Sequence, residues 1–204
     1  MFIAQGFEWA THQPLIKAIL DLYDPKFVLE LGCGIFSTPL FMDREAMFIE
    51  NDIDWIEHIK NEFGIDVIYH DLGEVHDCDF INDLTGEQDK QFVDYYESLI
   101  IPDLKPNLLF VDHVPSCRVI SINTLRGKFD IIMYHDCDDI GMQTNNYHLI
   151  NKEGFNSYVL TTNRTGTCVM IRKEVDKGSL NEALKLHIKE FQEKYPECTK
   201  MELQ

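Results

Sequence analysis

The sequence predicts an α/β protein with a doubly wound, mainly parallel seven-stranded sheet that ends in an antiparallel β-hairpin. Short apolar runs alternate with stretches of helical period, which is typical of βα units. A glycine turn follows the first apolar run, and the last two runs are separated only by "NRTG". The 204 residues suit one domain. We expect 1–204 to be a single unit with an N-terminal helical segment at 1–25, a core sheet at 26–173 and a C-terminal helix at 178–196.

Five apolar or β-branched runs predict the parallel strands. "NLLFV" within the fourth run is continuously apolar, as a buried central strand should be. We expect these strands at 26–30, 46–50, 66–70, 106–112 and 129–136. The segment 155–173 is expected to form the two antiparallel strands, with "NRTG" as the turn between them.

Helices are predicted where apolar residues recur at a spacing of three or four. Ile53, Ile56, Ile59 and Phe63 show this spacing after the second strand. We expect helices near 11–22, from Ser37 or Thr38 onward, and at 52–63, 88–100, 116–127, 140–151 and 178–196. The N-terminal caps that we expect are Thr11, Asp54 paired with Glu57, and Ser179 paired with Glu182.

Charge and composition exclude several function classes. The chain carries 18 basic and 35 acidic side chains, a formal net charge of −17, without a polybasic patch. Nucleic acid and anionic membranes are therefore not expected as partners. No apolar run is long enough to span a bilayer, and "MFIAQGFEWATHQP" lacks the features of a signal peptide, so we expect a cytoplasmic protein. The six cysteines form no C-x-x-C pair, which argues against a zinc ribbon.

Acidic residues stand at or beside the ends of all five predicted parallel strands. Ligands of doubly wound sheets bind beyond the carboxyl ends of the strands. A single acid there is explained by a helix cap or a solvated loop, whereas the whole set predicts a site. The set is Glu30, Glu50, Asp71, Asp112 and the pair His135-Asp136.

The glycine turn "ELGCGIFS" favours a ligand without phosphate. It has G-x-G, but Ser37 stands where the third glycine of a dinucleotide turn would be. Glu50 could accept the hydroxyls of a ribose. Glu30 would repel a pyrophosphate and suits a ligand with a cationic group. S-adenosylmethionine has an ammonium group and no phosphate, while NAD and ATP have the reverse.

"VLELGCG" followed by "MFIEND" resembles motifs one and two of class I S-adenosylmethionine-dependent methyltransferases, and the resemblance extends over about 26–173. It implies a Rossmann-like methyltransferase fold and S-adenosylmethionine as cofactor. By this resemblance Glu30 lies near the methionine part, Glu50 holds the ribose, and Asp71 and Leu72 lie near the adenine. The cofactor-binding candidates are Glu30, Gly32, Gly34, Ser37, Glu50, Asn51, Asp71, Leu72 and Asp112.

Three later stretches, "FIENDIDWI", "VDHVPSCR" and "MYHDCDD", resemble the plant glucuronoxylan 4-O-methyltransferases. This likeness implies a hydroxyl acceptor on a sugar or small molecule, although the glycine-rich loop of that group after Asp112 is lacking. The candidates for the proton-accepting base and its neighbours are Asp112, His113, His135 and Asp136. For either histidine the alternative is a loop-ordering hydrogen bond. Arg118 could hold an acidic substrate or pair with Asp112.

A divalent metal ion at the strand ends stays open as an alternative. Catechol-type and macrocin-type O-methyltransferases hold magnesium with carboxylates after strands four and five, where Asp112, Asp136, Asp138 and Asp139 stand here. The histidines beside them would suit a softer ion better.

Two other functions compete with O-methyl transfer. One is a nicotinamide-dependent oxidoreductase, which Ser37, Glu30 and the terminal hairpin disfavour. The other is a methyltransferase-fold protein that binds a ligand without catalysis.

Overall fold

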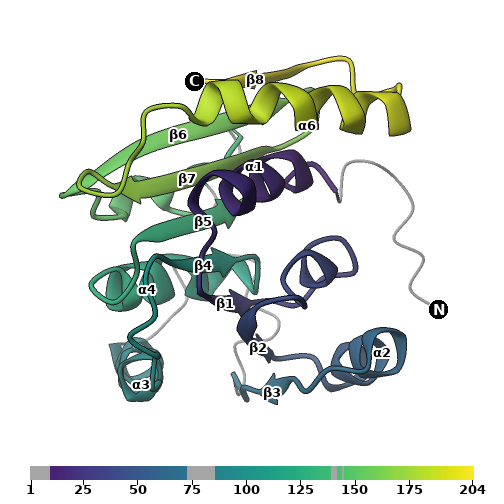
Figure 1. Cartoon of the computed structure of the whole chain (residues 1–204). Coiled ribbons are helices and arrows are strands. Elements are labelled where there is room, and N and C mark those ends of the chain that lie inside the picture. The colour runs from purple at the N-terminus through teal and green to yellow at the C-terminus, as the bar shows by residue number, and fades with distance from the viewer. Residues whose placement is uncertain (1–9, 73–85, 139–141, 144) are drawn as a thin grey trace.

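The computed structural model describes residues 10–72, 86–138, 142–143 and 145–204 (Figure 1). The strands are β1 (Phe27–Leu31), β2 (Glu45–Glu50), β3 (Ile68–Tyr69), β4 (Asn107–Val111), β5 (Ile131–His135), β6 (Phe155–Thr162), β7 (Gly166–Arg172) and β8 (Met201–Leu203). The helices are α1 (Gln13–Tyr23), α2 (Ile53–Phe63), α3 (Gly86–Ser98), α4 (Pro115–Leu125) and α6 (Leu180–Lys194), with short 3-10 helices η2 (Thr38–Leu40) and η5 (Tyr147–Leu149).

The strands form one sheet in the order β3-β2-β1-β4-β5-β7-β6-β8. The five strands from β3 to β5 are parallel, whereas β7, β6 and β8 join by antiparallel pairing. The direction of strand succession reverses between β1 and β4, the position at which doubly wound sheets bind ligands. The mainly parallel sheet and its antiparallel hairpin are confirmed.

The predicted count of seven strands is wrong, because the sheet has eight. The extra strand β8 pairs with the outer edge of β6, with Thr161 opposite Glu202. Three residues are too few for an alternating pattern to be recognised in a sequence. Strand β3 is also shorter than the predicted 66–70, since only Ile68 and Tyr69 pair with β2.

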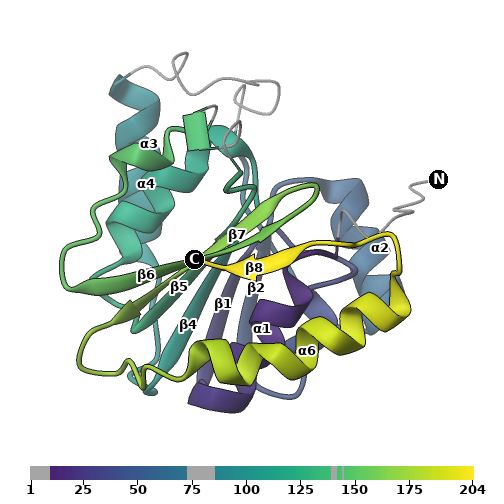
Figure 2. The same ribbon diagram turned by 90° about the horizontal axis from the view of Figure 1, so that it is seen from above.

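Helices cover both faces of the sheet (Figure 2). Apolar residues of α1, α2 and α6 pack with Val28 of β1, while those of α3 and α4 pack with Leu29 and Leu31. Successive side chains of a strand point to opposite faces. Glu30 therefore faces the α1 side of the sheet, opposite to its neighbour Leu31.

One predicted helix is reduced to a single turn. The turn after β1 leads only into η2, because β2 already begins at Glu45 and leaves no room for a longer helix. In the described part of 140–151 we find only η5 as a helix with defined bounds. Helix α4 ends at Leu125, two residues before the predicted Gly127.

The predicted caps are wrong as well. His12, not Thr11, precedes α1, and the Thr11 hydroxyl lies against His135 instead. Asp52 caps α2 by accepting a hydrogen bond from the Trp55 amide, because Asp54 already lies within the first turn. Ser179 makes no side-chain cap, since its backbone (ψ 15°) is not in the extended conformation typical of a capping residue.

None of the helices in the described ranges has the length and apolar character needed to cross a membrane.

Candidate functional site

A pocket opens at the carboxyl ends of β1, β2 and β4. Its lining comes from both sides of the switch point and from the α3 side of the sheet. The lining residues are Leu31, Gly32, Ile49, Glu50, Asn51, His70, Leu72, Tyr96 and His113. The pocket therefore lies where the sheet topology predicts a ligand.

Four of the predicted cofactor-binding residues meet in this pocket: Gly32, Glu50, Asn51 and Leu72. The other five do not line it. Glu30 is fully buried on the opposite face of the sheet, and Ser37 lies beside it. The remaining three are Gly34, Asp71 and Asp112.

Glu50 is 7% exposed and ties the turns after β1 and β2 together. One carboxylate oxygen accepts hydrogen bonds from the amides of Asn51 and Asp52, at 2.6 and 3.0 Å. The other accepts from the amide of Cys33, between the two glycines, at 3.0 Å. Burial raises the pKa of Glu50, and these three amides oppose that shift. Since each carboxylate oxygen has two acceptor positions, the Cys33-bonded oxygen can still accept a ligand hydroxyl.

The first glycine of the turn is required because the turn packs against the backbone that follows β4. Gly32 has φ +88°, and a Cβ atom there would lie 2.4 Å from the amide nitrogen of His113 and 2.6 Å from the carbonyl oxygen of Asp112. The turn after β1 thus packs directly against the backbone that follows β4. The indole of Trp55 also holds this turn by donating a hydrogen bond to the Cys33 carbonyl at 2.6 Å.

Glu30 is a buried acid with an incomplete set of partners. One carboxylate oxygen accepts a hydrogen bond from the Thr38 hydroxyl at 2.7 Å, while the other has no partner among the described residues. Burial raises the pKa of Glu30 to about 8, and the hydroxyls of Ser37 and Thr38 oppose the shift only in part. The group is therefore protonated near neutral pH, and is not the fixed negative charge that the sequence predicts.

Glu30→Gln should remove a pH dependence of stability. Because the folded-state pKa of about 8 lies above the ordinary value of 4.5, the group's stabilising contribution is complete below pH 4.5 and is lost as the pH rises toward 8. The wild-type free energy of unfolding should fall by up to about 1.4 kcal/mol more per pH unit than that of Glu30→Gln. Urea unfolding followed by circular dichroism across this range measures the difference.

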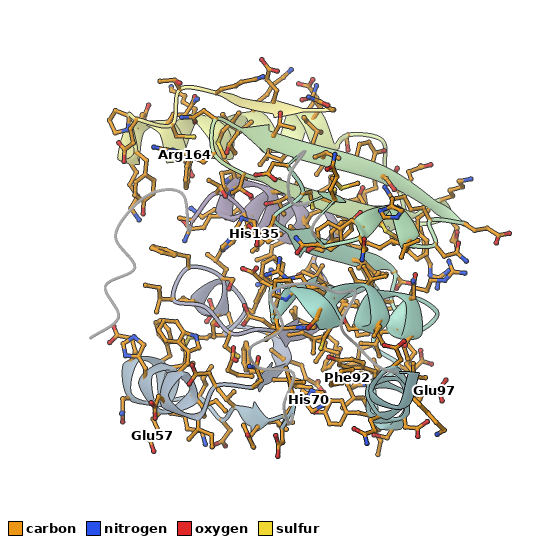
Figure 3. The ribbon with its side chains drawn as sticks, turned by 180° about the vertical axis from the view of Figure 1, so that it is seen from behind. Glu57, His70, Phe92, Glu97, His135 and Arg164 are labelled. Atoms are coloured by element: carbon orange, nitrogen blue, oxygen red, sulfur yellow. The ribbon has the colours of Figure 1, made fainter. Side chains whose placement is uncertain are left out.

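Glu57→Gln is the matched control, because Glu57 is exposed on α2 and points away from the sheet (Figure 3). Its unfolding should retain the wild-type pH slope. Parallel slopes for wild type and Glu30→Gln would show that Glu30 is already ionised in the folded state.

Two histidines of the pocket are held neutral. His70 stacks on Tyr95 with ring centroids 3.5 Å apart, and it faces Phe92 of α3 edge-on at 6.1 Å (Figure 3). Burial lowers the pKa of His70 to about 4. Burial and the nearby Arg118 lower the pKa of His113 to about 3. Glu50 is the one acidic side chain among the described residues that line the pocket, and none of them is a lysine or arginine.

His113 is bound within its own loop. One ring nitrogen lies 3.2 Å from the Val114 carbonyl oxygen and the other 3.2 Å from the Ser121 hydroxyl. These contacts fit the loop-ordering alternative better than the role of a base.

Arg118 organises the ends of β4 and β5. Its guanidinium is buried, donates to the carbonyl oxygens of His113 and His135, and lies 3.1 Å from Asp112 and 2.8 Å from Asp136. The Tyr147 hydroxyl completes its surroundings at 3.2 Å. Of the two roles considered for Arg118, the structure shows the pairing with Asp112.

His135 lies against two carboxylates. Its Nδ1 atom is 3.5 Å from Asp112 and 3.3 Å from Asp136, and its Nε2 atom is 3.0 Å from the Thr11 hydroxyl. Burial alone would lower the pKa of His135, but the two carboxylates outweigh it and raise the pKa. For Asp112 burial opposes ionisation, yet His135 and Arg118 bring its pKa down to about 2. His135, Asp112 and Asp136 therefore form a proton-holding group at the strand ends.

The carboxylates after β4 and β5 do not fit a magnesium site. Arg118 occupies one oxygen of Asp112 and one of Asp136, and the other oxygen of each faces His135. Magnesium prefers an octahedral set of oxygen ligands, whereas His135 also lies between these carboxylates. Asp138 is partly exposed nearby, and Asp139 lies outside the described residues.

Sequence reasoning missed several residues of this region. His70 and Tyr96 line the pocket, and His12 lies beside His135 with ring centroids 4.9 Å apart. His70 directly follows the third strand, so its position at a strand end could have identified it. Tyr96 lies on α3 and His12 directly precedes α1, and both reach the site only through packing of the whole domain.

Comparisons with known proteins agree with the fold. No protein family profile and no curated protein sequence matches this chain. A solved structure named as a "putative caffeoyl-CoA O-methyltransferase" from Staphylococcus aureus is similar, with a TM-score of 0.50 and 16% sequence identity over 78% of this chain and 81% of that chain. The two proteins share a fold. At this identity the likeness concerns the architecture alone.

Proposed function

We propose that this protein is an S-adenosylmethionine-dependent methyltransferase that methylates a hydroxyl oxygen of a small molecule or a sugar. The observation that carries the proposal is the charge of the pocket. Glu50 provides a carboxylate at its wall, and the two histidines beside it are held neutral. Among the described residues, a lining with one acid and no cationic side chain suits a ribose and disfavours a phosphate-bearing cofactor.

The turn after β1 supports the same ligand class. Dinucleotide cofactors place their pyrophosphate at the N-terminus of a helix that follows the glycine turn. Here only the three-residue η2 follows, and a helix that short provides no comparable dipole. The fold shared with a protein named as an O-methyltransferase is a further, weaker support.

The cofactor would supply an electrophilic methyl group. Glu50 would accept hydrogen bonds from the ribose hydroxyls, with Asn51 and Leu72 beside the adenosine part. In the protein without a bound metal ion, His135 and Asp112 would receive and hold the proton that the acceptor hydroxyl loses. A carboxylate that orients a histidine in this way is a common arrangement for a general base.

Calorimetry with S-adenosylhomocysteine and NADH tests the proposal. EDTA-treated protein should bind S-adenosylhomocysteine with one site per chain and should not bind NADH. Binding of NADH with no binding of S-adenosylhomocysteine would instead support the oxidoreductase. Incubation with S-adenosylmethionine and a panel of hydroxylated metabolites should then yield a product heavier by one methyl group. Cofactor binding without any such product over the panel would favour the non-catalytic alternative.

A further inference from the structure

Three side chains from distant parts of the sequence converge beside β4 and β5, on the α1 side of the sheet. They are His12 before α1, Asp112 after β4 and His135 at the end of β5. One potential ligand atom from each lies within 4.8 Å of those of the other two. The two histidines are 3% and 5% exposed, and His135 lies deep inside the molecule (Figure 3).

His12 is the member of this group whose polar atoms are unsatisfied. Neither of its ring nitrogens has a hydrogen-bond partner among the described residues, although both are buried. Its ring lies edge-on to His135 and 5.4 Å from Phe110, so its surroundings are otherwise apolar. Burial of a polar atom without a partner is unfavourable, and coordination of a metal ion by one ring nitrogen would offset that cost.

The hydrogen-bond and ion-pair partners of His135 and Asp112 resemble those that orient metal ligands. The Thr11 hydroxyl contacts Nε2 of His135, which leaves Nδ1 facing the Oδ2 atom of Asp112 at 3.5 Å and the Oδ1 atom of Asp136 at 3.3 Å. Arg118 holds the other oxygen, Oδ1, of Asp112. Metal-binding histidines and carboxylates are typically oriented by such outer hydrogen bonds through the atom that does not face the ion.

We propose that His12, Asp112 and His135 bind a divalent transition-metal ion such as Zn²⁺. Two imidazoles and one carboxylate are ligands that zinc, iron or cobalt accept, whereas magnesium favours oxygen ligands. Ligands at about 2.1 Å from one ion lie at most about 4.2 Å apart. In a tetrahedral site they lie about 3.4 Å apart, so the three ligand atoms, now within 4.8 Å of one another, have to approach by up to roughly 1.4 Å through side-chain rotation.

Such a site would have an open coordination position. Three protein ligands leave room for a water molecule or an oxygen atom of a bound molecule. The Asp112 side chain is 25% exposed and the neighbouring Asp136 side chain 43%, so the site is accessible from solvent on this side. The proposal does not depend on S-adenosylmethionine binding, because the cofactor test uses EDTA-treated protein.

Calorimetric titration of the EDTA-treated chain with ZnCl₂ tests the site. Wild type should bind one Zn²⁺ per chain, and His12→Gln should bind it on the order of 100-fold more weakly. The control is His148→Gln, which removes an exposed histidine on η5 and should bind as wild type does. Absence of tight binding to wild type, or equal affinity in wild type and His12→Gln, would overturn the proposal.

Cobalt(II) spectroscopy of the wild type gives an answer even if His12→Gln fails to fold. Bound Co²⁺ should show the visible ligand-field bands of a nitrogen and oxygen ligand set. It should lack the intense near-ultraviolet charge-transfer band of a cobalt–thiolate bond, because no cysteine belongs to the set. Appearance of a thiolate band would place the ion at one of the buried cysteines and contradict the assignment.

Discussion

Glu50→Gln should weaken the binding of S-adenosylhomocysteine by about 100-fold. A hydrogen bond to a charged group contributes roughly 1.5–3 kcal/mol, and about 2.8 kcal/mol corresponds to a hundredfold change in affinity. The glutamine side chain has one acceptor oxygen, and the amides of Asn51 and Asp52 already occupy that position in the wild type. Its NH₂ group would face both the Cys33 amide and the ligand hydroxyl, which need an acceptor. Calorimetry on the purified variant measures the loss.

The same substitution has a structural cost that has to be measured separately. Loss of the acceptor for the Cys33 amide should lower the free energy of unfolding by roughly 1–3 kcal/mol. Urea denaturation of the free protein reports this, and binding is compared only where both proteins are folded. Glu57→Gln removes the same charge from an exposed position and should bind as wild type does. Wild-type affinity in Glu50→Gln would exclude Glu50 as the ribose carboxylate.

Gly32→Ala should destabilise the fold by at least about 4 kcal/mol, among the largest effects expected of a single substitution. The added Cβ would lie 2.4 Å from the backbone nitrogen of His113, and backbone atoms of a central strand end cannot move aside as a flexible side chain could. The positive φ of +88° adds roughly 1–2 kcal/mol. The melting temperature should fall by about 10 °C or more for a chain of this size.

Gly154→Ala separates the two contributions. Gly154 has a similar φ of +83°, but an added Cβ would meet no heavy atom of the described residues within 4 Å. It should therefore lose only the roughly 1–2 kcal/mol of backbone strain. Equal destabilisation of the two variants would mean that close packing between the turns after β1 and β4 does not restrict position 32.

The elements that sequence reasoning predicted best are those with a strong local pattern. Continuous apolar runs identified β4 and β5, and the spacing of apolar residues identified α2. The misses are β8, the length of the helix after the first turn, and the caps. Pairing of β8 with β6 and the early start of β2 are decided by contacts between segments, which a local pattern does not contain.

For the site, too, local pattern predicted some residues, whereas contacts between distant segments decided the others. The position of Glu50 at a strand end was enough to bring it to the pocket. Alternation along β1 places Glu30 on the other face, although it is only two residues from Gly32. His12 is separated by 100 and 123 residues from Asp112 and His135, so only the packing of α1 on the sheet brings them together.

The turns after β1 and β4 pack main chain against main chain at Gly32, which lines the pocket. Substitutions at this contact therefore have little scope to change the pocket without disturbing the sheet. The walls of the pocket are different, because His70 and Leu72 follow the short edge strand β3 and Tyr96 lies on α3. Divergence in ligand preference among proteins built on this plan should accordingly concentrate in the wall residues, while the glycine turn stays constant.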